Sequence, residues 1–320
     1  MTTAVPAVRN AVRTWLEKFE AGDTVLVAVS GGADSLALAY ALSVEADKLA
    51  ITVIGVTVDH QLQATSSTQA QKVVDQLSKF GLKCVVKKVT VDVKEGLEAS
   101  ARKVRYEALS EVAKQENAVA VFLGHTKDDQ AETVLLGLAR GSGARSLSGM
   151  AAENGKYLRP FLQVTRQETE DACKELGLEI WNDPHNFNAD FTRVKVRREI
   201  LPLMESKLGP GISAALARTA GLLRDDADAL DGLAAAEISH LNLTDIDCEY
   251  LAALPRALRT RIIRAAIYAC GAPEGSITAD HVAAAEALVT SWRGQGPLSL
   301  PGGVKVERIS GRLSLSPHRP

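Results

Sequence analysis

The sequence lacks cysteine pairs and long hydrophobic runs, and both absences exclude classes of protein. Its four cysteines lie far apart with no Cys-x-x-Cys spacing, and they are Cys84, Cys173, Cys248 and Cys270. This spacing argues against an iron–sulfur cluster, a zinc site or a disulfide framework, so we expect reduced thiols. The longest apolar runs, such as Ile51 to Val58, are far too short to span a membrane, and the first residues lack a signal-peptide pattern. We therefore expect a cytoplasmic protein with no membrane partner.

An excess of charge of either sign is also missing. The chain has 37 Lys and Arg residues against 39 Asp and Glu residues, so any contact with RNA must come from local clusters. With 320 residues, of which 46% are hydrophobic, the chain is long enough for two domains. Gly209-Pro210-Gly211 is a breaker, so we predict one domain over residues 1–208 and a smaller, mainly helical domain over residues 209–320.

The first half of the chain alternates apolar runs with helical patterns. The apolar runs occupy Thr24 to Val29, Ile51 to Val58, Lys83 to Val91 and Ala118 to Leu123. This alternation predicts an α/β fold, a doubly wound parallel sheet with helices on both faces. Ligands bind beyond the carboxyl ends of the strands in such sheets, so the residues that follow three of these runs are expected to converge. These residues are Ser30, Asp59, His60, Gly124 and His125.

Other segments predict further elements. An apolar stripe from Val8 to Phe19 predicts an amphipathic helix, and the patterns predict more helices from Thr165 to Leu176 and from about Thr192. The end of the chain, Leu298 to Ser316, predicts a small β element. Four arginines of the predicted second domain could bind RNA or simply coat a helix, and they are Arg256, Arg259, Arg261 and Arg264.

The loop that follows the first apolar run is Ser30-Gly31-Gly32-Ala33-Asp34-Ser35. Its glycines let backbone amides approach an anion, its serines add hydroxyl donors, and the helix N-terminus behind it favours negative charge. It has neither the lysine of a Walker A loop nor the spacing of a dinucleotide-binding loop, which excludes those two classes. The alternative is a simple capping device, because Asp and Ser are preferred at helix starts.

This strand, loop and helix resemble the PP-loop, or N-type ATP pyrophosphatase, superfamily, whose mark is Ser-Gly-Gly-x-Asp-Ser. Enzymes of this superfamily cleave ATP between the α and β phosphates and adenylate an acceptor. The resemblance implies that Ser30 to Ser35 bind the phosphates of ATP and that Asp34 lies near Mg²⁺. It also implies that the ATP site includes Asp59, His60, Gly124 and His125.

A second motif, Gly124-His125-Thr126-Lys127-Asp128-Asp129-Gln130-Ala131-Glu132-Thr133, follows the fourth apolar run and enters a helix. Asp129 and Glu132 stand at positions i and i+3, so their carboxylates share one helix face. Two carboxylates there could bind a cationic amine or a magnesium ion. They could equally be acids that only decorate a helix start.

Together the two motifs resemble the tRNA(Ile)-lysidine synthetase family. Members attach free lysine to the wobble cytidine of an isoleucine tRNA with a CAU anticodon, through an adenylated cytidine, and release AMP and pyrophosphate. The resemblance implies ATP and Mg²⁺ as cofactors, and isoleucine tRNA and free L-lysine as partners. It also implies that Asp129 and Glu132 bind lysine and take part in catalysis with Asp34.

Several arginines lie in segments that resemble the same family. Leu97 to Tyr106 resembles its Glu-x-x-Ala-Arg-x-x-Arg-Tyr helix, and later segments resemble its Arg-Gly-Ser-Gly turn and its basic helix. Arg159-Pro160-Phe161-Leu162, with Arg166 and Glu168, resembles another segment without a role assigned to it. The resemblance implies catalytic roles for Arg105 and Arg197 and tRNA contacts for Arg102, Arg140 and Arg193. A solvated helix face would explain Arg102 and Arg105, and a glycine C-cap would explain the turn.

The chain departs from the family pattern at Gln61, Gln63, His185 and Val194, which bears on RNA and lysine contacts. It resembles the short form, and its oligomeric state stays open, with a homodimer as one option. Two other functions were weighed. A PP-loop tRNA thiolation enzyme is disfavoured by the missing Cys-x-x-Cys pair, and a non-catalytic nucleotide- or RNA-binding module would bind ATP without releasing pyrophosphate.

Overall fold

The computed structural model describes the chain except residues 1–3, 62–65, 93–96, 142, 182–191 and 318–320. Contacts divide the chain into two compact units. The first unit comprises Met1–Gly141 with Ser146–Ala220, and the second comprises Ser142–Arg145 with Gly221–Pro320. The division falls within one helix, α10 (Ile212–Ile238). The boundary at 208/209 and the roles given to the two domains stay predictions.

The first unit is built on a mostly parallel sheet in the strand order β3-β2-β1-β4-β6-β5. Its strands are β1 (Thr24–Ala28), β2 (Thr52–Asp59), β3 (Lys83–Lys88), β4 (Ala120–Phe122), β5 (Glu153–Asn154) and β6 (Tyr157–Leu158). β1 pairs in parallel with β2 and with β4, and only the short β5 runs antiparallel, against β6. The predicted parallel sheet is therefore confirmed, and its central strand leads into the glycine-rich loop.

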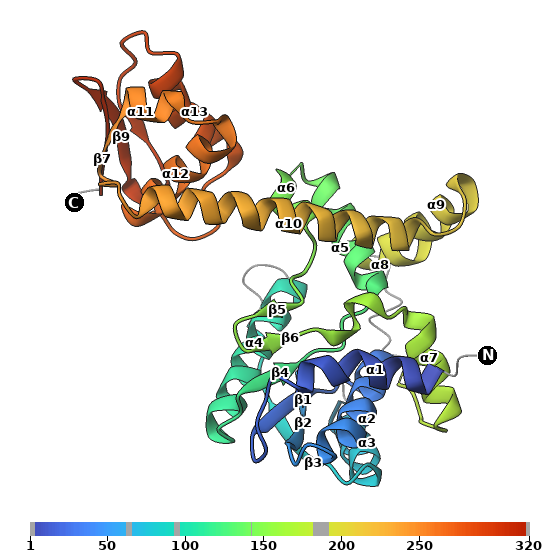
Figure 1. Cartoon of the computed structure of the whole chain (residues 1–320). Helices are drawn as coiled ribbons and strands as arrows, with labels where there is room; N and C mark the ends of the chain where they lie inside the picture. The colour runs from blue at the N-terminus through green and yellow to red at the C-terminus, as the bar shows by residue number, and fades with distance from the viewer. Residues whose placement is uncertain (1–3, 62–65, 93–96, 142, 182–191, 318–320) are drawn as a thin grey trace. The chain divides into compact units, whose positions relative to one another are not determined.

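Helices follow the strands in the predicted alternation (Figure 1). The helices up to β4 are α1 (Ala4–Leu16), α2 (Ala33–Asp47), α3 (Ser66–Lys79) and α4 (Leu97–Gln115). Those after β4 are α5 (Lys127–Ala139), α6 (Gly143–Leu147), a 3-10 turn (Pro160–Gln163), α7 (Arg166–Glu175), α8 (Thr192–Lys195), a π-helix (Val196–Ile200) and α9 (Leu201–Leu208). The helices predicted from 165 and from 192 are both present.

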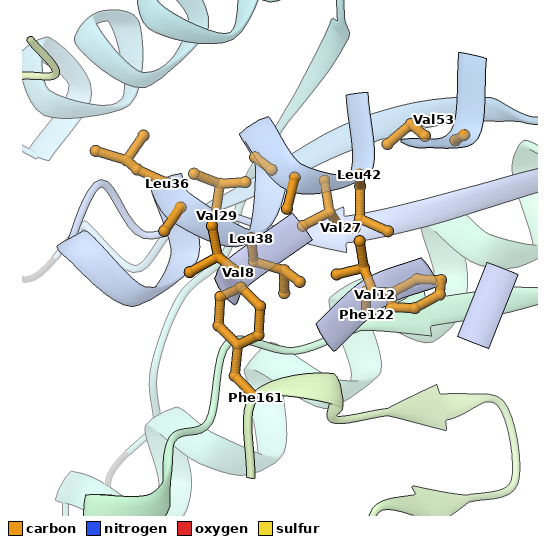
Figure 2. Packing of buried hydrophobic residues seen from close by; sticks show 14 of the residues in the cluster. Val8, Val12, Val27, Val29, Leu36, Leu38, Leu42, Val53, Phe122 and Phe161 are labelled. Atoms are coloured by element: carbon orange, nitrogen blue, oxygen red, sulfur yellow. The ribbon is translucent and has the colours of Figure 1, made fainter. Parts of the chain in front are cut away.

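Two apolar clusters, one on each face, hold the sheet. Alternate residues of β1 separate, because successive side chains point to opposite faces of a strand. Val27 packs with residues of α1, α2 and the 3-10 turn, as Figure 2 shows for Val8, Leu38 and Phe161, whereas Leu26 packs with Leu109 of α4. Helices therefore cover both faces, as expected for a doubly wound sheet.

The N-terminal helix is shorter than predicted. α1 ends at Leu16, and Phe19 lies in the turn that follows it. Phe19 still packs on the core, because its ring meets that of Phe122 edge to face at a centroid distance of 6.2 Å. The apolar stripe therefore marked the buried face correctly but ran past the end of the helix.

The second unit has its own sheet and its own core. The antiparallel sheet has the order β7-β10-β9-β8, with β7 (Asp245–Asp247), β8 (Leu298–Ser299), β9 (Lys305–Ile309) and β10 (Arg312–Ser316). Its helices are α11 (Cys248–Ala253), α12 (Arg256–Ala269), α13 (Ala279–Thr290) and a 3-10 turn (Pro301–Gly303). The predicted β element is present, and β7 joins it from before the helices.

Two expectations drawn from absences can be compared with the structure. All four cysteines are free, and three of them are buried while Cys84 is partly exposed. Among the described residues, no helix is both long enough and apolar enough to cross a membrane.

Candidate functional site

The glycine-rich loop after β1 is shaped as an anion cradle. Gly31 has a φ of +89°, which L side chains rarely adopt, and a Cβ there would lie 2.8 Å from the side chain of Gln69. The backbone amide of Ser30 donates to the hydroxyl of Ser35 at 3.1 Å, and that hydroxyl donates to the carbonyl of Gly32 at 3.0 Å. The two serines therefore hold the loop closed around its glycines.

The capping alternative for this loop is not supported. The residue that caps α2 is Gly32, and no side chain among the described residues caps this helix end. Asp34 lies in the first turn instead, and its carboxylate accepts a bond from Thr169. The first amides of α2 are therefore left to an outside acceptor, which is the arrangement that binds phosphates at helix starts.

The end of β4 lies directly against the start of α2. A Cβ at Gly124 would meet the backbone of Asp34 and Ser35 at 3.1 Å, so a glycine is needed at this position. This contact brings two segments that are far apart in the sequence, the loop after β1 and the motif after β4, to one edge of the sheet. The carboxyl ends of adjacent parallel strands meet at such an edge.

The two acids of the second motif lie at the start of α5. Thr126 is the N-cap of α5. Its backbone amide donates to the carboxylate of Asp129 at 2.8 Å, which completes a capping box. Glu132 is fully buried. Its carboxylate accepts bonds from Arg197 at 2.6 and 3.0 Å, and Arg197 also reaches Asp129 at 3.1 Å. The two carboxylates thus share one guanidinium, as residues on one helix face can.

Two residues of α7 complete this cluster, and no role was predicted for either. Arg166 donates through one nitrogen, Nη2, to Asp129 at 3.0 Å and to Glu132 at 3.4 Å, and its Nε lies 3.9 Å from Asp34. Thr169 donates to Asp34. The available signal was the Thr165-x-x-Glu168 capping box, which marks the start of α7 but not what the helix faces.

Burial shifts the acid–base behaviour of this cluster. Burial and the nearby charge of Asp129 raise the pKa of Asp34 to about 6, against the opposing bond from Thr169. Burial alone would raise the pKa of Asp129, but the charges of Arg166 and its other neighbours outweigh it and hold that pKa below the ordinary value. Burial lowers the pKa of His125 to about 3, so this imidazole is neutral at physiological pH.

Two arginines of α4 lie near the neutral His125, and Arg193 of α8 lies near one of them, Arg105. Arg105 is the more buried of the α4 pair, and burial and then the charge of Arg102 lower its pKa. Arg102 is exposed, and its guanidinium lies 5.1 Å from the ring centre of Tyr106. Arg193 reaches Thr133 of α5 at 3.4 Å. The structure thus gathers Arg102, Arg105 and Arg193 near the acids of α5, where an anion would meet positive charge.

Three further predicted site residues lie at the end of β2 or at the far end of α5. Asp59 is buried at the end of β2 and accepts the amide of Gln61, while His60 follows it on the same strand end. Arg140 is exposed at the C-terminal end of α5, the opposite end of the helix from Asp129. Arg140 is therefore far along the helix from the acids at the start of α5.

The departures from the family pattern can be located only in part. Gln61 has a φ of +53°, in the left-handed region that favours glycine, and glycine is what the family pattern has there. Val194 lies in α8 between Arg193 and Lys195. Gln63 and His185 lie outside the described residues.

The arginines of the second unit mostly hold their own unit together. Arg259 is bound to the buried Glu286 at 2.8 Å, and Arg261 is paired with Asp231. Arg264 donates to the carbonyl of Ile277 at 3.1 Å. The side chain of Arg256 is 71% exposed beside a cavity of about 440 Å³ between α12 and α13. Arg256 is also paired with Glu286, at 3.0 Å, but it is the most exposed of the four.

Comparisons with known proteins agree with this arrangement. Residues 6–204 match the family model described as the PP-loop domain, and residues 246–314 match the model described as the TilS substrate binding domain. The chain is 51% identical over 315 residues to the tRNA(Ile)-lysidine synthase of Thermobifida fusca, covering 98% of this chain and 97% of the relative. It is 53% identical over 295 residues to that of Streptomyces coelicolor, covering 90% and 84%.

Solved structures show the same fold at low sequence identity. The U34-tRNA thiolase NcsA of Methanococcus maripaludis, solved with its [4Fe-4S] cluster, aligns with a TM-score of 0.59 at 19% identity. The alignment covers 69% of this chain and 80% of that one. At this identity the likeness concerns the fold alone.

Proposed function

The chain belongs to the tRNA(Ile)-lysidine synthases, and we propose that its PP-loop unit joins free L-lysine to the wobble cytidine of an isoleucine tRNA with a CAU anticodon. The observation that carries this proposal is the contact of one side chain, Arg166, with both Asp129 and Glu132 and its approach to Asp34. The acid of the phosphate loop and the two acids expected to bind lysine therefore lie within one cluster. A protein that uses ATP to join an amine to a base needs this proximity.

In the first step the loop from Ser30 to Ser35 holds the β and γ phosphates of ATP. The C2 oxygen of cytidine attacks the α phosphorus, the bond to the bridging oxygen breaks, and pyrophosphate leaves. Arg105 lies among positive neighbours, so it is placed to offset charge that develops on the phosphate. The neutral His125, whose buried Nδ1 has no hydrogen-bond partner among the described residues, can accept a bond from the bound nucleotide.

In the second step the side-chain amine of lysine attacks C2 of the adenylated cytidine, and AMP leaves with the C2 oxygen. Asp129 and Glu132 hold the amine. The lowered pKa of Asp129 makes it a good partner for a cation, and Asp129 or Glu132 accepts the proton that the amine loses. Arg197 is bound to both carboxylates and holds them next to each other.

Magnesium fits this site only together with the nucleotide. No group of three or more His, Cys, Asp or Glu side chains among the described residues is placed to hold a metal. Mg²⁺ commonly binds one or two carboxylates and completes its shell with substrate phosphates and water. Asp34, in the first turn of α2, is the carboxylate that would hold it, and the ion would neutralise charge on the phosphates.

Contacts with tRNA are assigned to arginines outside the acid cluster. Arg102 and Arg193 lie close enough to His125 or α5 to hold the backbone near the reacting base, and Arg140 would act further along α5. The second domain, of which residues 246–314 match a substrate-binding model, would hold another part of the tRNA, with the exposed Arg256 as a candidate contact. An enzyme with this substrate belongs in the cytoplasm.

An assay of lysine incorporation into isoleucine tRNA tests the proposal. We expect incorporation by the wild type, and loss of at least about a hundredfold in Asp34→Asn and Asp129→Asn, the size typical for loss of a key charge interaction. Glu153→Gln, in an exposed pair with Lys18, is the matched acid control and should leave the rate unchanged. Pyrophosphate release without lysine incorporation, or ATP binding with neither, would point to another acceptor or to a non-catalytic module and reject the proposal.

A further inference from the structure

Without any ligand, the acids expected to bind lysine are already paired with cations. Each oxygen of the buried Glu132 accepts a bond from Arg197, and Oδ1 of Asp129 accepts bonds from both arginines. The other oxygen of Asp129 accepts bonds from Thr126. An incoming ammonium group therefore finds no unpaired carboxylate oxygen in this pair and must displace a resident donor.

The two arginines hold the acids unequally. Arg197 grips Glu132 through two nitrogens, at 2.6 and 3.0 Å, and a fork of this kind is strong and directional. Arg166 uses a single nitrogen for both Asp129 and Glu132, at 3.0 and 3.4 Å. Arg166 is therefore the donor that a competing cation replaces more easily.

The position of Arg166 also suits displacement of its side chain alone. Its backbone amide donates to Asp128 at 2.8 Å, and the amide of Lys127 donates to Val164 at 2.8 Å, so the starts of α5 and α7 are fastened together. Its side chain lines a cavity of about 260 Å³ with Glu132, Arg197 and Leu201. A small ligand entering there meets the guanidinium of Arg166 on its way to the acids.

We propose that Arg166 is a positioning residue that occupies the cation site between Asp129 and Glu132 and yields it to the ammonium group of the substrate amino acid. The inference rests on the proposed function, because it takes these acids as the lysine site. A ligand with its own positive charge can take the place of Arg166, whereas a neutral one would leave the two buried carboxylates to share the single positive charge of Arg197. The displaced residue would thereby add to selectivity for lysine over amino acids with uncharged side chains.

Substitution of Arg166 tests this role by separating KM from kcat. In Arg166→Met the apolar stem remains and the competing cation is gone, so the KM for lysine should fall by about tenfold, the equivalent of one charge-assisted hydrogen bond. Arg166→Lys keeps a cation and should stay near the wild-type KM. Methylguanidinium added to Arg166→Met should refill the site and inhibit competitively against lysine, with little effect on the wild type.

Other results would overturn the inference. A raised KM in Arg166→Met would mean that Arg166 itself binds the substrate, and an unchanged KM with a lower kcat would mean that it only supports the structure. A structure of the wild type with lysine gives an answer that needs no variant, since a retained contact from Nη2 to Glu132 would exclude displacement. If the wild type forms no lysidine at all, the proposed function fails, and not only the role of Arg166. Pyrophosphate release measured in the same assays would then show whether the protein still activates another acceptor.

Discussion

Asp34 combines a chemical task with an energetic cost to the fold. Its side chain is one-quarter exposed, in a setting that raises its pKa to about 6, yet binding of Mg²⁺ would require the ionised form. An acid whose pKa is higher in the folded than in the unfolded protein destabilises the fold above that pKa. The bond from Thr169 and the charge of Arg166 oppose the shift without removing it.

Removing this charge should therefore stabilise the protein while abolishing its activity. Asn keeps the size of Asp34 and an oxygen for the bond from Thr169. At pH 7.5 in metal-free buffer, we expect Asp34→Asn to raise the free energy of unfolding by about 2 kcal/mol, reduced from the full shift for partial exposure. The gain should shrink as the pH falls from about 6 towards the ordinary pKa of 3.8, because the wild-type carboxyl is protonated in both states below that value.

Chemical denaturation at a series of pH values measures this difference. Asp128→Asn is unsuitable as a control, because Asp128 accepts the amide of Arg166. The exposed Asp75, which pairs with Gln71 on α3, offers a better one, and Asp75→Asn should change stability by less than about 0.5 kcal/mol. A loss of stability in Asp34→Asn at pH 7.5 would show that the carboxylate supports the fold.

Single residues also mark where sequence reasoning succeeds. Gln61 was flagged because the family pattern has glycine there, and its φ of +53° shows why glycine suits the position. By contrast, nothing near Arg259 in the sequence reveals Glu286, since the two meet only through the packing of α12 against α13. Local backbone demands can be predicted from a pattern, whereas partners distant in the chain cannot.

At the scale of elements, one buried acid fastens α1 to α2. Glu45 is 3% exposed and is surrounded by Arg9 at 2.7 Å, Lys48 at 2.8 Å and Arg13 at 3.1 Å. The hydrogen bond from Arg13, with the other two cations, lowers the pKa of Glu45 to about 2 against the effect of burial. An acid with a depressed pKa stabilises the folded state above its unfolded pKa.

Neutralising this acid should loosen the contact between the two helices. We expect Glu45→Gln to lower the free energy of unfolding by about 2 kcal/mol at pH 7, a figure reduced for the half-exposed cations. The contribution should be complete above the ordinary pKa of 4.5 and should disappear as the pH falls towards 2. Urea unfolding at pH 7 and pH 3 checks the sign, and an equal loss at both values would contradict the ionic explanation.

For some helices of the site the sequence predicts both the position and the role, and for others it predicts the position alone. α5 was predicted with its acids on one face, because residues at i and i+3 always share a face. α7 was predicted as a helix, but its role could not be, since its approach to Asp34 depends on the fastening of Arg166 to Asp128 and on the fold around it. The spacing of apolar residues predicts a helix and its buried face, but it does not predict which element packs against that face.

The whole molecule contains separate apolar cores, and this has a measurable consequence. Leu38 is fully buried in the core of the first unit, and Ile263 is fully buried in the core of the second. No residue belongs to both of these clusters. Each core should therefore respond by itself when a large side chain is removed.

We expect Leu38→Ala and Ile263→Ala each to destabilise their own unit by about 2–5 kcal/mol. Hydrogen exchange followed by mass spectrometry resolves the two, because peptides from β1 and from β10 report on different sheets. Leu222→Ala, at a position 68% exposed on α10, should have little effect on either. Equal loss of protection in both sheets from one core variant would show that the units unfold together.

The sheet of the first unit is the part of the architecture that the sequence predicted best. Four apolar runs became β1, β2, β3 and β4 in parallel. β1, β2 and β4 are largely buried, and a strand buried on both faces needs an almost continuous apolar run, whereas β3 lies at the sheet edge and is more exposed. β5, β6 and β7 were missed, since strands of two or three residues carry too little pattern. The limits of the two domains, predicted at a glycine-rich break, stay a matter for experiment.

The pairing of Asp129 and Glu132 with arginines has one more consequence, for the protein without a bound amino acid. Buried carboxylates without partners would push a vacant pocket towards swelling or collapse. Here the guanidinium groups of Arg166 and Arg197 compensate the charges of the two carboxylates when no amino acid is bound. The folded protein therefore needs no bound amino acid to compensate these two buried negative charges.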